Sequence, residues 1–410
     1  MKTKKRLLMV SLDAVSSDDV QLLQKMPHFA ELCKQGTLVC DVSTVLVSNT
    51  YPAHTSIITG TYPNKHGIVD NVTLSPKKKF PNWCYQACDI KVPTLYEKAK
   101  AQGLKTCAIL YPVTGGATAI EYNFPEIAGK MNPFARIYKM LTEGSAWFIL
   151  SNLWRHWKHL QGISQPALDD FTTSVAADTI LRHKPDVLTL HLIDADAQKH
   201  TYGPDSEQAS KALLRHDNRL GKLIDALQEA GTYDETSIIV FSDHGCLPVH
   251  TAVDPNEYLI KQNIIRKRNN QIIDHDAYFH NAGGTTFLKL YCPKKKNEVS
   301  QVVTNVLKES YVGRKLTDEE MTRSGMDNNY IAGLEAADGY YFGKPGYKGQ
   351  HGYASMHEGN LPFYLAVGKS ICKGKEVLGG CITDICPLAA QMLDIPQWEM
   401  DGILHRELLC

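Results

Sequence analysis

Short apolar runs alternate with longer amphipathic stretches along most of the chain. The apolar runs predict strands at residues 6–12, 105–111, 186–193, 236–242, 285–291 and 361–368. Several of these runs are too continuously apolar to expose one face to water, which is typical of strands in a parallel sheet covered on both faces. The amphipathic stretches predict helices at residues 92–102, 166–182, 206–230, 297–309 and 384–393. We therefore predict an α/β fold with a mostly parallel central sheet sandwiched by helices.

Two stretches interrupt this alternation. Residues 117–165 contain clustered aromatic side chains, and residues 250–345 contain polar linkers rich in lysine, arginine and asparagine. We expect both to be insertions that form a cap on a single domain spanning residues 1–410, although the aromatic residues of the first also suit ordinary packing helices. The most apolar run, residues 147–154, is far shorter than the ~20 residues needed to cross a bilayer, so we expect no membrane span.

The composition is that of a folded globular protein. Hydrophobic residues make up 43% and charged residues 21% of the chain, which argues against disorder and against fibrous classes. Lysine and arginine together number 44, as do aspartate and glutamate. A chain of zero formal net charge lacks the positive field that non-specific binding of nucleic acid needs, so we do not expect polymeric nucleic acid as a partner.

The N-terminal residues and the cysteines bear on the cellular compartment. The basic and apolar start of the chain has features of a signal peptide, but its apolar run stops at Asp13 and lacks a small-residue cleavage site, so we interpret it as a strand. Eleven cysteines are scattered without the spacing of a disulfide framework, and we expect reduced thiols. Together these observations predict a cytoplasmic protein.

Acidic residues fall where predicted strands end. Asp13 ends the first strand, Asp196 follows the third, and Asp243 with His244 ends the fourth. The carboxyl ends of parallel strands face one crevice, so residues that are distant in sequence can meet there. Carboxylate and imidazole ligands suit Zn²⁺, Mn²⁺ or Fe better than metals that prefer thiolates. We therefore expect a metal site at this edge of the sheet.

Two local spacings support this expectation to different degrees. Asp196 and His200 lie four residues apart and would share one face of a helix, although such a pair is also common as a surface salt bridge. Asp243 and His244 are adjacent at a strand end, and Gly245 after them permits the tight turn that would present both side chains. The second spacing is the more informative of the two.

Residues 48–71, S-N-T-Y-P-A-H-T-S-I-I-T-G-T-Y-P-N-K-H-G-I-V-D-N, carry the most specific pattern. This segment resembles the nucleophile segment of the nucleotide pyrophosphatase/phosphodiesterase (type I phosphodiesterase) family of the alkaline phosphatase superfamily. The resemblance places Thr50 at the position of the nucleophile and Asn71 at that of a residue that binds a phosphoryl oxygen. Pro52 and Gly60 suit the first turn and the end of a helix, so Thr50 would lie at a helix N-terminus, which favours phosphate and equally a capping residue.

Further motifs of the same family follow in its order through most of the chain. They are D-A-Q-K-H-T-Y-G-P, S-D-H-G, G-Q-H-G-Y and the closing T-D-I-C-P segment. By this resemblance, one metal is bound by Asp13, Thr50, Asp243 and His244, and the other by Asp196, His200 and His351. The backbone N–H of Tyr51 is expected to hold a substrate oxygen together with Asn71.

The resemblance implies an alkaline phosphatase-like fold and a metal-dependent phosphohydrolase, either a phosphodiesterase or a nucleotide pyrophosphatase. Thr50 would attack phosphorus and form a covalent phospho-threonine, with two divalent cations as cofactors, Zn²⁺ before Mn²⁺ or Fe. The substrate would be a small phosphodiester, nucleotide or phosphonate. Two alternatives stay open: a phosphonate hydrolase of the phosphonoacetate type and, from another class, a non-catalytic relative that retains the metal cluster.

Other residues near these motifs receive a more ordinary interpretation. The family spacing selects Asp196 rather than Asp194 as a ligand. Five histidines in or near the motifs are expected to have structural or hydrogen-bonding roles: His54, His66, His250, His280 and His357.

Overall fold

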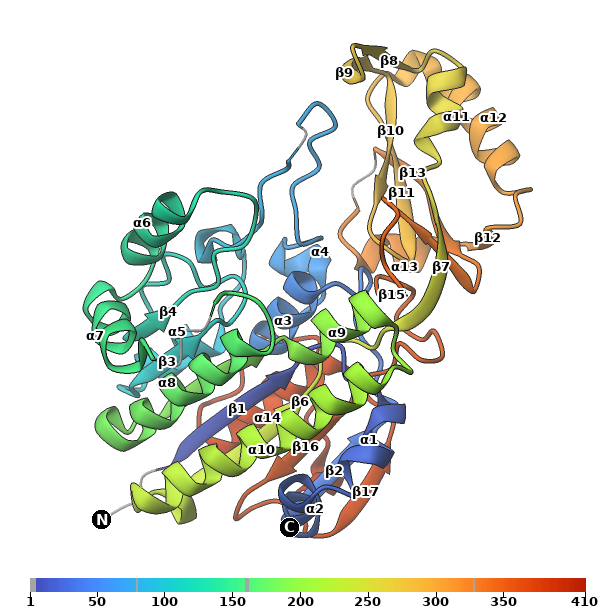
Figure 1. Ribbon diagram of the computed structural model, residues 1–410. Coiled ribbons are helices and arrows are strands. Elements are labelled where there is room, and N and C mark those ends of the chain that lie inside the picture. The colour runs from blue at the N-terminus through green and yellow to red at the C-terminus, as the bar shows by residue number, and fades with distance from the viewer. Residues whose placement is uncertain (1–4, 79, 159–161, 327–328) are drawn as a thin grey trace.

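An eight-stranded sheet runs through the main body of the molecule (Figure 1). The computed structural model describes residues 5–78, 80–158, 162–326 and 329–410. The strands of the sheet, in spatial order, are β17 (Lys375–Leu378), β2 (Gly36–Cys40), β16 (Tyr364–Val367), β6 (Thr236–Phe241), β1 (Arg6–Leu12), β5 (Val187–Leu192), β3 (Thr106–Ile109) and β4 (Tyr122–Phe124). Only β16 runs antiparallel to its neighbours. The predicted α/β fold with a mostly parallel sheet is confirmed.

Helices cover both faces of this sheet. Alternate residues of β1 point to opposite sides: Leu8 and Val10 belong to one hydrophobic core, and Leu7 and Met9 to another. The first core is closed by α1 (Ser17–Leu23), α2 (Pro27–Gln35), α8 (Ala167–His183) and α10 (Glu207–Glu229). The second is closed by α3 (Thr50–Thr59), α5 (Leu95–Ala101) and α14 (Ile385–Met392). Burial on both faces explains why the strand sequences are continuously apolar.

Most predicted elements appear within a few residues of their expected bounds. Five of the six predicted strands lie in the central sheet, and the five predicted helices are α5, α8, α10, α12 (Lys296–Val306) and α14. The predicted strand at 285–291 is β11 (Thr285–Leu290), which lies in a different sheet. Two short helices that the prediction did not include, α4 (Pro63–His66) and α9 (Asp194–Tyr202), lie near the carboxyl ends of the strands.

Residues 247–350 form a second lobe, at the upper right of Figure 1 in yellow to orange and red. A four-stranded antiparallel sheet contains β10 (Ala277–Asn281), β11, β13 (Tyr330–Ala336) and β12 (Val312–Lys315). Smaller sheets contain β14 (Gly339–Phe342), β7 (Leu247–Val253) and β15 (Gly349–Gln350), and β8 (Ile265–Arg268) with β9 (Gln271–His275). With α11 (Asn256–Lys261), α12 and α13 (Asp318–Arg323), the lobe has a hydrophobic core of its own that includes Phe279 and Leu288. Residues 327–328 of the expected insertion lie outside the described residues.

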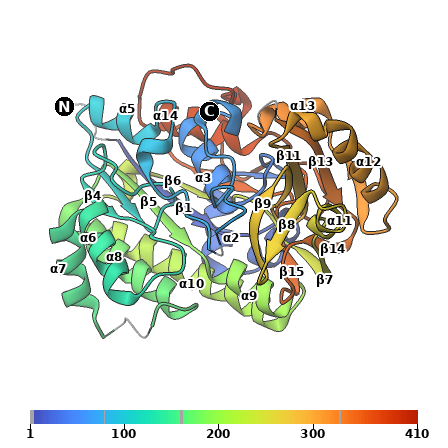
Figure 2. The ribbon, with the colours of Figure 1, turned by 90° about the horizontal axis from the view of Figure 1, so that it is seen from above.

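The first expected insertion lies at the opposite side of the molecule. It supplies the edge strand β4 and two helices, α6 (Pro133–Glu143) and α7 (Ala146–His156), which contact each other. Figures 1 and 2 both show this helix pair on the side away from the second lobe. Residues 159–161 lie outside the described residues.

One pair of cysteines departs from the prediction of reduced thiols. Cys372 and Cys410 form a disulfide, because their segments are paired through a bridge between Ile371 and Leu409 that brings the two Cα atoms to 5.0 Å. The other nine cysteines are free thiols. Within the described residues, no helix combines the length and the apolar character that crossing a membrane requires. The cytoplasmic location stays a prediction.

Candidate active site

The predicted ligand segments meet at the carboxyl ends of three neighbouring strands. β6, β1 and β5 are adjacent in the sheet, and Asp13 directly follows β1. Asp243 and His244 follow β6 after one residue, and α9 begins one residue after β5. Parallel pairing therefore brings together segments that are separated by up to 230 positions in the sequence.

Asp13, Asp243 and His244 form a fully buried group, here called cluster one. The Nε2 atom of His244 lies 3.2 Å from an oxygen of Asp243 and 3.6 Å from an oxygen of Asp13. Each of the three side chains offers one ligand atom, and these atoms lie within 4.8 Å of one another. The group is therefore compact enough to surround a single cation.

Asp196, His200 and His351 form a second group, here called cluster two, with the same spacing of ligand atoms. Asp196 and His200 share one face of α9, and Asp196 Oδ1 lies 3.2 Å from His200 Nε2. His351 follows β15, on the chain that returns from the second lobe, and its Nε2 lies 3.9 Å from the same oxygen. Because His351 joins it, the Asp196–His200 pair is more than a surface salt bridge.

The two clusters adjoin each other. The rings of His244 and His351 stack with centroids 4.2 Å apart and an interplanar angle of 25°. Burial, and then the neighbouring His244 and His200 charges, lower the pKa of His351 well below its usual range. His351 is therefore neutral at physiological pH, the state in which an imidazole binds a metal.

The hydrogen bonds of the three histidines fix which nitrogen is free. Nδ1 of His200 donates to the carbonyl oxygen of Gly349 at 2.8 Å, and Nδ1 of His244 donates to that of Gly245 at 2.9 Å. Nδ1 of His351 donates to Oδ1 of Asn49 at 2.7 Å. Each ring therefore keeps the lone pair of Nε2 for its cluster, which is the usual arrangement of metal-bound histidines.

Several atoms of the clusters are buried and lack a hydrogen-bond partner within the described protein. They are Asp13 Oδ1, Asp196 Oδ1, Asp243 Oδ2 and His244 Nε2. Burial, and then the charges of Asp243 and Asp196, raise the pKa of the Asp13 carboxyl well above its usual range. Crowded, unpaired carboxylate oxygens are costly unless cations neutralise them. The donor set of carboxylate oxygen and imidazole nitrogen fits two divalent cations such as Zn²⁺ or Mn²⁺.

Thr50 is the first residue of α3, as its sequence context predicts. Asn49 is the N-cap residue, and Gly60 ends the helix in the left-handed conformation at φ 68°. Thr50 lines a cavity of about 410 Å³ together with Asp13 and residues of cluster two. Thr50, at the N-terminus of α3, therefore borders a space large enough for a phosphoryl group.

Asn71 lies beside this helix start. The backbone N–H of Tyr51 donates to Oδ1 of Asn71 at 2.8 Å, which orients the Asn71 side chain. The Nδ2 hydrogens of Asn71 are then the donors that we expect to reach a phosphoryl oxygen. Direct contact between the Tyr51 N–H and substrate stays a prediction, as does the role of Asn71.

A chain of hydrogen bonds behind cluster two was not predicted from the sequence. Asn49 accepts from His351 and donates from Nδ2 to Asp70 Oδ1 at 2.7 Å. The other oxygen of Asp70 pairs with Nε2 of His280, on β10 of the second lobe, at 2.5 Å. The only feature of the sequence that pointed to Asp70 was its position directly before Asn71 in the family motif. These hydrogen bonds connect His351 of cluster two to the second lobe.

His191 supports cluster one in a similar way. It lies on β5, is fully buried, and its Nε2 pairs with Asp13 Oδ2 at 2.9 Å. Its Nδ1 lies 3.2 Å from the carbonyl oxygen of Leu110 and 3.5 Å from Glu126 Oε2. A histidine within an otherwise apolar strand was the only sequence signal for this contact.

The remaining polar residues near the motifs make the following contacts. Asp194 is held by Arg215 and Arg219 at 2.6 to 3.0 Å and belongs to neither cluster. His54 approaches Asp243 at 3.3 Å, and His66 pairs with Ser56 Oγ at 2.9 Å. His250 and His357 contact Thr251 and the backbone of Glu358.

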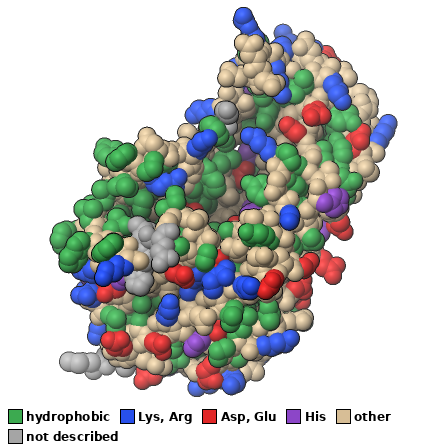
Figure 3. All heavy atoms as spheres, in the orientation of Figure 1, with side chains coloured by type: hydrophobic (Ala, Val, Ile, Leu, Met, Phe, Trp, Pro, Cys, Tyr) green, Lys and Arg blue, Asp and Glu red, His purple; other side chains and the backbone are tan. Residues whose placement is uncertain are grey.

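The cavity beside Thr50 is poor in basic side chains. Within the described part of the chain, none of its lining residues is lysine or arginine, and its walls include Trp83 and Tyr347. Figure 3 shows a hollow between the first insertion and the second lobe in which histidine side chains are visible. The positive charge that a phosphate needs there would come from bound cations.

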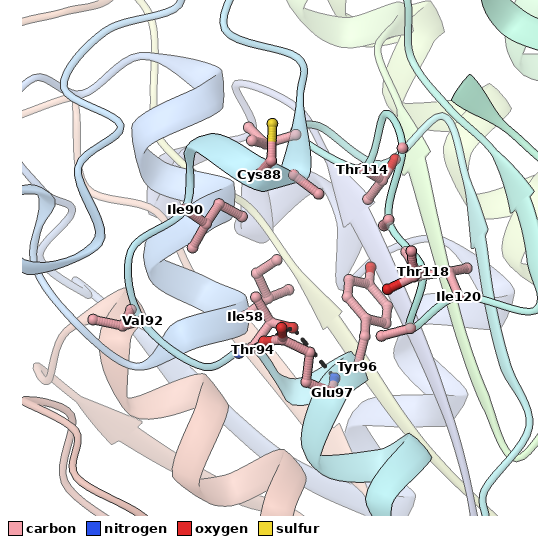
Figure 4. Close-up of a pocket in the computed structure, with 15 residues that line it drawn as sticks. Ile58, Cys88, Ile90, Val92, Thr94, Tyr96, Glu97, Thr114, Thr118 and Ile120 are labelled. Atoms are coloured by element: carbon pink, nitrogen blue, oxygen red, sulfur yellow. Dashed lines mark hydrogen bonds between the residues drawn. The ribbon is translucent and has the colours of Figure 1, made fainter. Parts of the chain in front are cut away.

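A second cavity, of about 220 Å³, lies at the other end of α3 (Figure 4). Its wall is mostly apolar and includes Ile58, Ile90 and Ile120. Its carboxylate, Glu97, accepts hydrogen bonds from the backbone N–H and hydroxyl of Thr94 at the start of α5. This cavity contributes no residue to either cluster.

The fold is of alkaline phosphatase-like architecture, and its two adjacent clusters could each hold a cation. The chain belongs to the type I phosphodiesterase/nucleotide pyrophosphatase family, because the model of that family matches residues 7–354. The proteins of this family are hydrolases, and the chain is therefore an enzyme of that class.

Individual relatives agree with this assignment. The human ectonucleotide pyrophosphatase/phosphodiesterase family member 1 is 32% identical over 231 residues, which cover 54% of this chain and 21% of that protein. The bis(5'-adenosyl)-triphosphatase ENPP4 of Bos taurus is 27% identical over 252 residues, which cover 58% of this chain and 47% of that protein. The aligned stretches span less than half the length of either relative.

A solved structure matches nearly the whole chain. Murine ectonucleotide pyrophosphatase/phosphodiesterase 5, as an inactive variant in complex with AMP, superimposes with a TM-score of 0.74 at 19% identity. The match covers 99% of this chain and all of that one. It confirms the fold.

Proposed function

We propose that this protein is a two-cation phosphodiesterase that cleaves small nucleotide-type phosphodiesters or pyrophosphates, with Thr50 as its nucleophile. The names of its relatives support the substrate class, since one is a bis(5'-adenosyl)-triphosphatase and another binds AMP. The observation that carries the proposal is the common orientation of His200, His244 and His351. Each donates from Nδ1 to an oxygen and presents Nε2 to carboxylate oxygens beside the Thr50 cavity.

The residues that would hold the two cations follow from the clusters. Asp13, Asp243 and His244 with Thr50 would hold one, and Asp196, His200 and His351 the other. When bound, the two ions would favour the alkoxide form of Thr50 and neutralise the phosphoryl group. The ions would be Zn²⁺, with Mn²⁺ or Fe as alternatives.

Thr50 would carry out the chemistry in two steps. The Thr50 hydroxyl gives its proton to solvent, and its oxygen forms a bond to phosphorus while the bond from phosphorus to the departing oxygen breaks; the leaving group takes a proton from solvent. Water then hydrolyses the phospho-threonine and restores the hydroxyl. Asn71, oriented by the N–H of Tyr51, donates to a non-bridging oxygen as charge develops.

The charges of this arrangement balance. Asp13, Asp196 and Asp243 together with the Thr50 alkoxide would match the charge of two divalent cations, so the ions and their ligands would together be approximately neutral. The cavity wall adds the carboxylates Asp70 and Glu126 and, among the described residues, no lysine or arginine, which suits a singly charged diester better than a more highly charged phosphate.

Turnover of bis-p-nitrophenyl phosphate by the purified chain tests the proposal. We expect hydrolysis that a chelator abolishes and that added Zn²⁺ or Mn²⁺ restores. A metal-loaded chain that hydrolyses no diester or nucleotide would favour the non-catalytic alternative. Release of phosphate from phosphonoacetate in place of diester hydrolysis would favour the phosphonate hydrolase.

Replacement of Thr50 by alanine tests the nucleophile separately. Thr50→Ala should lower turnover by about 10⁴-fold or more while the metal content stays close to that of the parent chain. Thr304→Ala, an exposed threonine on α12, is the matched control and should leave turnover unchanged. Near-normal turnover of Thr50→Ala would remove Thr50 from the reaction.

A further inference from the structure

One face of α7 is apolar but exposed to solvent. Trp147, Leu150 and Trp154 recur at helical spacing and continue to Trp157, just past the helix end. The side chains of Trp147 and Trp154 are 81% and 78% exposed. Such large apolar side chains rarely remain in water on a monomeric protein unless they meet a partner.

The opposite face of the same helix packs into the protein. Phe148 and Ile149 are buried in the core beside the central sheet. Helix α7 is therefore apolar on nearly all sides, whereas a surface helix of a soluble protein has one polar face. The exposed face of α7 is therefore suited to contact with an apolar surface.

Helix α6, which contacts α7, carries a second exposed apolar face. Phe134, Ile137 and Tyr138 share one side of this helix, and Phe134 is 86% exposed. Figure 3 shows hydrophobic side chains gathered over α6 and α7 on the left of the molecule. We call the exposed side chains Phe134, Ile137, Tyr138, Trp147, Leu150, Trp154 and Trp157 the α6–α7 face.

The segment that carries this face is rich in basic residues. The segment from Lys130 to Lys158 contains five lysines and arginines and a single acidic residue, Glu143, although the whole chain has equal numbers of basic and acidic residues. Lys158 lies over the ring of Trp157 at 5.8 Å. Arg155 is 3.3 Å from Asp178, so its charge is partly compensated. The net positive charge complements an anionic surface.

We propose that the α6–α7 face docks this protein on the surface of a lipid bilayer that contains anionic lipids. Tryptophan and tyrosine side chains favour the boundary between headgroups and acyl chains, and lysine and arginine beside them pair with anionic headgroups. Three of the five tryptophans of the chain lie on this face. The helices lie on the bilayer and do not cross it. The docking surface is separate from both metal clusters and does not rest on the proposed reaction.

Vesicle sedimentation with the full chain tests this surface. The chain is mixed with vesicles of phosphatidylcholine alone and of phosphatidylcholine with phosphatidylglycerol, and the bound fraction is measured after centrifugation. We expect binding that is stronger with the anionic lipid and weaker at high salt, together with a blue shift of tryptophan emission. Absence of binding to both kinds of vesicle overturns the proposal.

Two sets of variants locate the contact. Trp147→Ser combined with Trp154→Ser should lower vesicle partitioning by about tenfold or more. The matched control, Leu378→Ser combined with Ile403→Ser, replaces two exposed apolar residues far from α6 and α7 and should bind as the parent chain does. Equal binding of both variants overturns the proposal. Thermal unfolding midpoints close to that of the parent establish that each variant is folded.

Charge and self-association give independent readouts. Lys130→Gln combined with Lys158→Gln should weaken binding to the anionic vesicles by about fivefold per removed charge and leave binding to phosphatidylcholine unchanged. Sedimentation velocity without vesicles measures the oligomeric state. If the parent chain is a dimer and Trp147→Ser with Trp154→Ser makes it monomeric, a second copy covers the face and the bilayer proposal is wrong.

Discussion

Cluster one and cluster two are held together by different parts of the fold. Cluster one is buried and comes from the ends of β1 and β6, which pair directly in the central sheet. Cluster two is partly exposed, because Asp196 and His200 are carried by α9 and His351 by the chain that returns from the second lobe. The register of one sheet therefore determines cluster one, whereas cluster two forms only when the two lobes are correctly placed.

The supporting hydrogen bonds show the same difference. Asp13 of cluster one pairs with His191, which lies on the adjacent strand β5. His351 of cluster two is held by Asn49, and the bonds continue through Asp70 to His280 in the second lobe. We expect the loss of one side chain of cluster one to abolish metal binding there. Changes in the residues that support cluster two should weaken metal binding by smaller amounts.

The largest effect should come from cluster one. In Asp243→Asn, a neutral amide replaces a buried carboxylate that lies between His54 and His244, and we expect turnover of bis-p-nitrophenyl phosphate to fall by about 10⁴-fold or more. Added metal should not restore it, because the Asp243 side chain is fully buried and leaves no room for water to replace the lost carboxylate ligand. Asp234→Asn, an exposed control of equal charge change, should behave as the parent chain. A loss smaller than tenfold would show that Asp243 is not a ligand.

The same measurement on cluster two should give a smaller and partly reversible loss. We expect His351→Gln to lower turnover by about 10³-fold and to recover in part at high Zn²⁺ or Mn²⁺, since water can occupy a ligand position in a partly exposed site. Metal analysis should find that one of two ions is lost. Equal and equally irreversible losses in Asp243→Asn and His351→Gln would remove the distinction between the clusters.

The sequence could predict that Asp13, Asp196 and Asp243 meet, because each follows a strand with a recognisable local pattern. The apolar runs that form β1, β5 and β6 have the same character as strands in known parallel sheets, and the rule that such strands present their carboxyl ends together places Asp13, Asp196 and Asp243 in one crevice. His351 lacks a comparable local pattern and was found only through the resemblance of G-Q-H-G-Y to the family motif.

The supporting contacts could not be predicted, because no local sequence pattern identifies the two partners. The pair of Asp70 and His280 joins residues 210 positions apart on two lobes, and nothing in either local sequence identifies the partner. The apolar run of β11 has the same pattern whichever sheet it joins, so its place in the second lobe was also not evident. The aromatic residues of 117–165 predicted a cap or packing helices, but only the structure separates the buried face of α7 from its exposed one.

A moderate effect is expected where the second lobe supports cluster two. Asp70→Asn weakens the bond to His280 and disturbs Asn49, so we expect metal affinity and turnover to fall by about 10- to 100-fold. His280→Gln should have a similar effect, and the double variant should lose no more than either single one, because both act through the same chain of bonds. Asp89→Asn, an exposed control, should be neutral. Additive losses would show that Asp70 and His280 act separately.

The smallest effect should come from His66, and it concerns the free energy of unfolding rather than turnover. His66 stabilises the nucleophile segment without touching either cluster. The ring is buried, accepts from the N–H of Ile68 at Nδ1, and pairs with Ser56 Oγ at Nε2, so both nitrogens are used by the neutral form. Burial lowers the pKa of His66 to about 3. The folded pKa is below the unfolded value of about 6.5, so this stability is complete above pH 6.5 and is lost as the pH falls toward 3. Between pH 7 and pH 5 the loss should be about 2 kcal/mol, measured as the free energy of unfolding in urea.

His66→Gln should lack this part of the pH dependence, whereas the exposed control His250→Gln should keep it. An unchanged pH dependence in His66→Gln would show that the protonation of His66 is not linked to folding.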